Sequence, residues 1–215
     1  MSDEEKKIIE DAQKLYNQGK WIEAINLLET LTTQNEEEIA VKHRIEAWCY
    51  YYIAITIKGE ESLKLENLEK SEEYFRLALV GSKKEETIIS ALNGLVLVLW
   101  ILGNKEEAWK ISDEAIRRFK IEASVWNTRS ILARWAKDFK KAIEVCEKVY
   151  ETAKKVKDYR TAGHGKSNKA SVYLELHNKK EALKEYLEAE QMYLKDGKSD
   201  FHLENVRKKI KELNN

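Results

Sequence analysis

The side chains that could do chemistry in this sequence are few and scattered. The histidines and cysteines have no spacing typical of a metal site, and there is no Cys-x-x-Cys pair. Segment 163–166, Gly-His-Gly-Lys, is too short for a phosphate loop, and the nucleophile, zinc-protease and dinucleotide motifs are missing. We therefore expect no metal, no cofactor and no enzymatic activity. The histidines and cysteines tested for such spacing are His43, His164, His177, His202, Cys49 and Cys146.

Charge is balanced over the whole sequence but not along it. The 38 Lys and Arg residues equal the 38 Asp and Glu residues, yet residues 1–75 hold 17 acidic and 9 basic side chains, against 21 and 29 in 76–215. The balance speaks against nucleic-acid binding, which favours broad basicity. The asymmetry leaves open a weak homo-oligomer, in which the acidic end of one copy meets the basic end of another.

The composition favours a folded helical protein. With 43% hydrophobic residues, six Trp and ten Tyr the chain is not disordered, and with no Pro and eight Gly it is not a turn-dense β-protein. Residues 87–104 carry no charge, but their charged flanks favour a buried helix over a membrane span. Because the first residues do not resemble a signal peptide, we expect a cytoplasmic protein with buried thiols.

A repeated pattern of small and large residues divides the chain into helix pairs. In four segments two mostly small residues stand twelve positions apart, with a turn element between them. Small residues at such positions let two antiparallel helices approach closely, while large neighbours fill the space between them. The pairs are Ala12 and Ala24, Val96 and Ala108, Ser130 and Ala142, and Ala170 and Ala182.

This pattern resembles the tetratricopeptide repeat (TPR). The resemblance implies an all-α, right-handed solenoid of stacked antiparallel helix pairs, with about eleven helices in a single domain over residues 1–215. The copies are expected at about 5–34, 44–82, 89–119, 123–153 and 159–195, with a capping helix at 199–213.

The turns between paired helices carry their own signals. Gly19, Gly59 and Gly103 stand where a first helix must stop, a position that favours left-handed backbone, and Asp138 and Asn178 take that role in later copies. The second copy is degenerate, because the turn that follows its glycine is about seven residues longer than the pattern allows.

The resemblance also implies a concave surface lined by the first helix of each pair. Its apolar residues would form a wall, and its asparagines, which offer both a donor and an acceptor, would fix the backbone of a bound segment. We predict a protein-interaction adaptor that binds an apolar peptide or amphipathic helix. The site residues are Asn93, Leu97, Trp100, Ile101, Asn127, Ile131, Arg134, Trp135 and Asn168, and the second copy would add Cys49, Ile53, Thr56 and Ile57.

Other interpretations stay open. Ile and Trp at helical spacing are also typical of a core, and asparagines at such positions also bond a neighbouring helix. At the level of function, the alternatives are a regulatory domain that senses a peptide and changes its superhelical pitch, and a self-assembling oligomerisation module.

Overall fold

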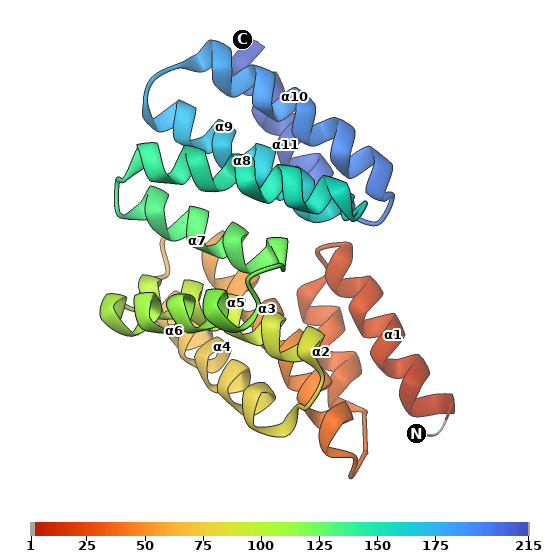
Figure 1. Ribbon diagram of the computed structural model, residues 1–215. Coiled ribbons are helices and arrows are strands. Elements are labelled where there is room, and N and C mark those ends of the chain that lie inside the picture. Colours follow the sequence, from red (N-terminus) through yellow and green to blue (C-terminus); the bar gives the residue numbers. More distant parts are fainter. Residues whose placement is uncertain (1–2, 215) are drawn as a thin grey trace. The chain divides into compact units, whose positions relative to one another are not determined.

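The computed structural model describes residues 3–214, which form eleven α-helices and no β-strand (Figure 1). This confirms the predicted fold class and the predicted number of helices. The helices are α1 (Asp3–Asn17), α2 (Trp21–Glu29), α3 (Glu36–Thr56), α4 (Glu61–Gly81), α5 (Glu85–Ile101), α6 (Lys105–Arg118), α7 (Ala123–Trp135), α8 (Phe139–Lys155), α9 (Tyr159–Glu175), α10 (Lys179–Asp196) and α11 (Asp200–Asn214).

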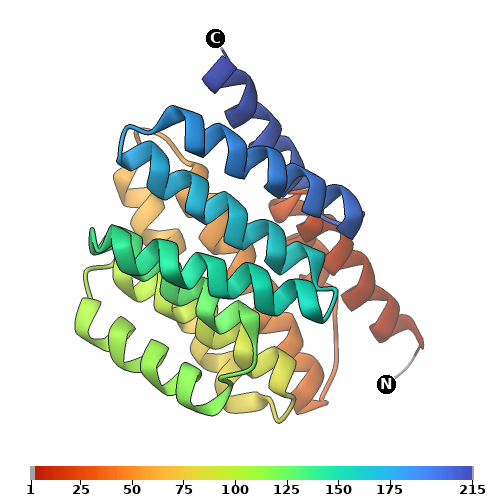
Figure 2. The same cartoon turned by 45° about the horizontal axis from the view of Figure 1, so that its top comes forward.

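The helices pack as stacked pairs. Neighbours in sequence contact each other from α1 to α5 and from α7 to α11, and first helices of successive pairs also contact: α1 with α3, α3 with α5, and α7 with α9. The contacts divide the chain into two compact units, residues 1–115 (unit 1) and 116–215 (unit 2), with the boundary inside α6. In unit 2, α8, α9 and α10 lie side by side (Figure 2). The single domain expected from the repeat stays a prediction.

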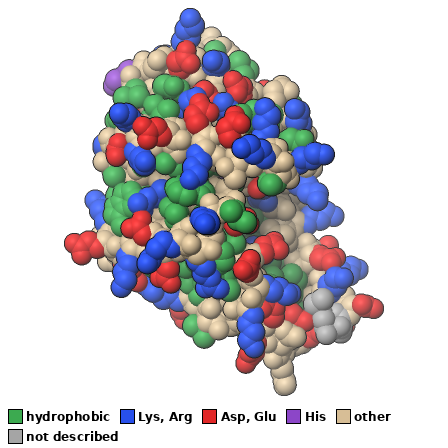
Figure 3. All heavy atoms as spheres, viewed as in Figure 1, with side chains coloured by type: hydrophobic (Ala, Val, Ile, Leu, Met, Phe, Trp, Pro, Cys, Tyr) green, Lys and Arg blue, Asp and Glu red, His purple; other side chains and the backbone are tan. Residues whose placement is uncertain are grey.

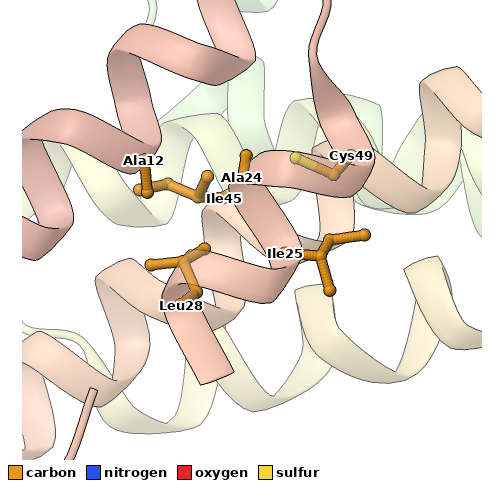
Figure 4. Close-up of a cluster of buried hydrophobic side chains, with 6 residues drawn as sticks. All are labelled: Ala12, Ala24, Ile25, Leu28, Ile45 and Cys49. Atoms are coloured by element: carbon orange, nitrogen blue, oxygen red, sulfur yellow. The ribbon is translucent and has the colours of Figure 1, made fainter. Parts of the chain in front are cut away.

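The core of unit 1 begins where α1 crosses α2. Ala12 and Ala24 have no exposed surface there, and the larger side chains of Leu28, Ile45 and Cys49 fill the space beside them (Figure 4). Small residues at the crossing therefore do what the repeat pattern predicts: they bring two backbones together so that branched side chains from α3 can cover both.

Helix α5 contains most of the charge-free segment 87–104, and its neighbours bury it. Eleven of its residues between Thr87 and Leu99 are buried, so its apolar surface is used for packing. Within residues 3–214, no helix combines the length and the apolarity needed to cross a bilayer. The same residues contain no cluster of three or more potential metal ligands, and both cysteines are free and buried.

The second pair differs from the expectation at its turn. Helix α4 begins at Glu61, directly after the turn at Gly59, and runs for 21 residues. The extra residues thus lengthen the helix and not the turn. Further along α4, Ser71 replaces the usual alanine at the crossing and donates its hydroxyl to the Ala47 carbonyl at 2.8 Å, which satisfies the buried polar group.

The turns after first helices all contain one left-handed residue. Gly19, Gly59 and Gly103 have φ of 78°, 78° and 93°, as expected, but in the later copies Lys137 and His177 themselves adopt φ of 63° and 58°. Asp138 and Asn178 do not take this conformation. Their side chains instead accept hydrogen bonds from the backbone N–H of Lys141 and Glu181, so they cap the following helices.

The left-handed histidine gives a direct test of this turn. We expect His177→Gly to raise the free energy of unfolding by about 0.5–1 kcal/mol, because glycine removes the Cβ strain at positive φ and loses only part of that gain to unfolded-state entropy. Thermal unfolding should show a midpoint about 1–4 °C higher. The matched variant is Gly103→Ala. Its added Cβ meets no atom within 4 Å, but the alanine would be strained at φ 93°. A lower midpoint for His177→Gly would contradict this account.

Candidate functional site

Helices α7 and α9, the first helices of the two pairs in unit 2, bring two predicted site residues together. The amide nitrogen of Asn168 donates to the amide oxygen of Asn127 at 2.9 Å, and both side chains are half-buried. This bond uses one donor and one acceptor of the pair. It leaves the Nδ2 group of Asn127 as a donor and Oδ1 of Asn168 as an acceptor for another molecule.

The same side of α7 and α9 ends in charged groups. Two turns after Asn127, Nε of Arg134 lies 3.7 Å from Oε1 of Glu175 on α9, and Nζ of Lys137 lies 2.6 Å from its Oε2. Ile131 stands between the asparagine and the arginine on α7, at the spacing that keeps the three on one helical face. We call Asn127, Ile131, Arg134, Asn168 and Glu175 the α7–α9 face.

Unit 1 has polar contacts of the same kind between its first helices. Arg44 of α3 donates to Oε1 of Gln13 on α1 at 2.9 Å, and Nε1 of Trp48 donates to the hydroxyl of Ser90 on α5 at 3.0 Å. The ring of Tyr52 stacks on Trp21, with centroids 5.5 Å apart and planes 11° apart. Sequence reasoning missed these α3 residues, although aromatic residues four positions apart could have pointed to them.

The predicted register of α3 is therefore wrong by one residue. Cys49, expected on the binding surface, has no exposed surface and belongs to the core formed with α1 and α2, and Ile53 packs against the same core. The residues that contact neighbouring first helices are Trp48 and Tyr52, one position earlier in each case. A shift of one residue turns a side chain by about 100° around the helix axis, which exchanges core for surface.

The predicted residues on α5 divide into two groups. Asn93 and Leu97 are only 8% and 5% exposed, so they contribute to the interior rather than to a solvent-facing surface. Trp100 is half-buried and packs edge-on against Trp109, with ring centroids 5.9 Å apart. The Lys105 ammonium lies over the Trp100 ring, 5.3 Å from its centroid. Ile101, next to Trp100, and Trp135, the last residue of α7, are also half-buried. A role for these three in binding stays a prediction.

A buried ionic network fixes the opposite side of α9. Glu185 of α10 is 3% exposed, and its two oxygens lie 3.1 Å from Nζ of Lys166 and 2.7 Å from Nζ of Lys169. Lys166 also pairs with Glu188 of α10 at 2.9 Å, and Lys169 with Glu147 of α8. The network joins three helices, and both lysines flank the position of Asn168 on α9. It therefore sets the rotation of α9 that turns Asn168 toward Asn127.

The network keeps its charges despite its burial. Burial alone would lower the pKa of each ammonium, but hydrogen bonds outweigh it: those to Glu188 and Glu185 raise the pKa of Lys166, and those to Glu147 and Glu185 raise that of Lys169. Both lysines are thus cationic at neutral pH. The buried thiol of Cys146, by contrast, is uncharged at neutral pH, because burial raises its pKa to about 11. It therefore contributes to packing and not to reactivity.

The comparisons with known proteins identify the fold. No family model matches the sequence, and no curated protein matches it either. Among solved structures, the chain is similar to one described as a Rap protein complexed with Competence and Sporulation Factor, with a TM-score of 0.54 and 12% identity, over 99% of this chain and 75% of that one. At this level of identity the likeness concerns the fold. It agrees with the TPR-like packing of helix pairs seen here.

Proposed function

We propose that this protein is an interaction adaptor, without catalytic activity, that holds an apolar peptide or amphipathic helix on the α7–α9 face. The single observation that carries the proposal is the Asn127–Asn168 pair, whose mutual bond at 2.9 Å leaves the Nδ2 group of Asn127 to donate and Oδ1 of Asn168 to accept. A peptide unit in an extended segment offers the complementary C=O and N–H groups, whereas a helix uses these groups internally. The pair therefore favours an apolar extended peptide over an amphipathic helix, regardless of the peptide's side chains.

The spacing along α7 suits a short extended segment. Asn127 and Arg134 are seven residues apart, which is about 10 Å along a helix. An extended peptide covers that length with about three residues. The apolar contact with Ile131 then lies between a backbone anchor and a charged anchor. This arrangement supports recognition of a segment with an apolar centre. The similar structure supports it too, because that Rap protein is described as complexed with Competence and Sporulation Factor.

A selection from a displayed random peptide library, followed by affinity measurement on purified protein, tests the proposal. We expect Asn127→Ala and Asn168→Ala each to weaken the selected peptides about tenfold, the effect of one lost hydrogen bond. The matched control is Asn205→Ala, an exposed asparagine on α11. If all three variants bind like wild type, or no peptide is selected on the wild-type protein, the α7–α9 face does not bind peptides.

Charge favours self-assembly as a second candidate function. Residues 1–115 hold 23 acidic and 14 basic side chains, whereas residues 116–215 hold 15 and 24, so the two compact units carry opposite net charges. On the face drawn in Figure 3, however, acidic and basic side chains are interspersed and do not form one patch of either sign. Light scattering at low and at high salt separates the two candidates, because an assembly held by exposed charges dissociates in high salt.

A further inference from the structure

The C-terminal helix α11 is attached to the rest of unit 2 along one side. Leu203, Ile210 and Leu213 pack against a cluster that includes Tyr186 and Tyr193 of α10. Val206 alone among the residues of α11 is buried. A helix with so little buried surface is easily detached from a helical stack.

Two histidines meet where α11 begins. The ring of His202, the third residue of α11, lies 4.6 Å from the ring of His164 on α9, with planes 70° apart. Tyr193 of α10 lies 5.7 Å from both rings and is nearly parallel to that of His202. Three helices therefore meet at these three rings. Nε2 of His164 is buried without a hydrogen-bond partner, as suits a neutral ring.

The surroundings of the pair oppose positive charge. Burial, and then the Arg160 guanidinium, lower the pKa of His164 to about 3; burial, His164 and Arg160 lower the pKa of His202 well below its ordinary value. Arg160 is on α9. The ring neighbours from α10 and α11, Tyr193 and Phe201, carry no charge at neutral pH. A proton on either half-buried ring would thus be a poorly solvated cation beside a second cation.

We propose that the His164–His202 pair is a pH-sensitive latch, which holds α11 in place at neutral pH and releases it on acidification. Release removes the packing around both half-buried rings, which then bind protons from water with an ordinary affinity. This inference is independent of the proposed peptide binding, because neither histidine belongs to the α7–α9 face.

The direction of the effect follows from proton linkage. A released histidine has a pKa of about 6.5, so below that pH the detached state binds more protons than the docked state. Each histidine then raises the opening equilibrium constant about tenfold per pH unit. Between pH 7.5 and 5.0 we expect an increase of at least about 30-fold if one ring responds, and up to about 1,000-fold if both respond.

Hydrogen exchange read by mass spectrometry on the full chain tests the latch. At pH 5.0 and 7.5, after correction for the intrinsic rate, peptides from 200–214 should lose protection by that factor on acidification, while those from α7 and α8 keep theirs. Glu46 of α3 has the opposite pH dependence, because burial raises its pKa to about 7 and it therefore destabilises unit 1 as pH rises. A loss of protection on acidification that is confined to α11 thus separates the latch from the titration of Glu46.

Two variants make the result specific. His164→Phe and His202→Phe keep an aromatic ring but cannot take up a proton, so each should reduce the response and the double variant should abolish it; His177→Phe, at an exposed histidine, should leave it unchanged. If 200–214 in the wild type is equally protected at both pH values, or if the double variant still responds like wild type, the latch is refuted. Where a variant fails to dock α11 at pH 7.5, the wild-type comparison alone decides.

Discussion

Replacing Glu185 by glutamine is expected to lower the free energy of unfolding by about 3 kcal/mol, the largest effect of any single charge in unit 2. Glu185 is 3% exposed and compensates two ammonium groups, those of Lys166 and Lys169. The amide keeps the volume of the side chain but removes its charge. The carboxylates that still pair with the two buried lysines are then Glu188 for Lys166 and Glu147 for Lys169. Urea unfolding followed by circular dichroism measures the loss.

Glu188→Gln is the matched control. It removes a carboxylate from the same lysine, Lys166, at a similar distance of 2.9 Å, but its side chain is 40% exposed. Solvent screens such a pair, and the expected loss is below about 1 kcal/mol. Replacing Lys166, Lys169 and Glu185 together by Met, Met and Leu should restore most of the stability lost in the single variant. Equal losses in Glu185→Gln and Glu188→Gln would show that burial does not strengthen the network.

Gly94→Ala is expected to destabilise the protein by about 2 kcal/mol, although alanine normally favours a helix interior over glycine by about 1 kcal/mol. The ring of Phe75, which has no exposed surface, lies directly on the backbone of Gly94, and a methyl group there would overlap the ring. Trp48 packs edge-on against the same ring, with centroids 5.2 Å apart, so the ring has little room to move. Chemical unfolding of the variant measures the cost.

The double variant Gly94→Ala/Phe75→Leu provides the internal control. Leucine is shorter than phenylalanine and makes room for the new methyl group, so the two changes should couple. We expect the double variant to be at least about 1 kcal/mol more stable than the sum of the two single effects. Additive effects would mean that the overlap between the ring and the methyl group is relieved elsewhere.

Several elements of the fold could be predicted from residue types alone. The spacing of small residues such as Ala12 and Ala24 predicts a helix crossing, and the structure places both with no exposed surface at that crossing. The glycines at 19, 59 and 103 predict left-handed turns and have them. These features are local. Each depends on a pair of helices joined by a short turn, so a segment of about thirty residues contains the information.

The turns of the later copies show where such reasoning stops. Asp138 and Asn178 were expected in the left-handed conformation, but Lys137 and His177 adopt it. An aspartate or asparagine suits both a left-handed position and a helix N-cap, and the following helix needs the cap. The sequence contains both possibilities. The position of the next helix relative to the turn decides between them.

By itself, the sequence determined that the chain is all-α, that its helices form pairs, and where each pair turns, because these depend on residues close together in the chain. Tertiary structure alone decided which side of each first helix carries usable polar groups. The partners of those groups are far away in sequence: Asn127 and Asn168 are 41 positions apart, and Trp48 and Ser90 are 42 apart. The helical period fixes on which side of its helix a residue lies. Whether a donor on that side can bind another molecule, or is used in a bond within the fold, depends on the helix that packs beside it.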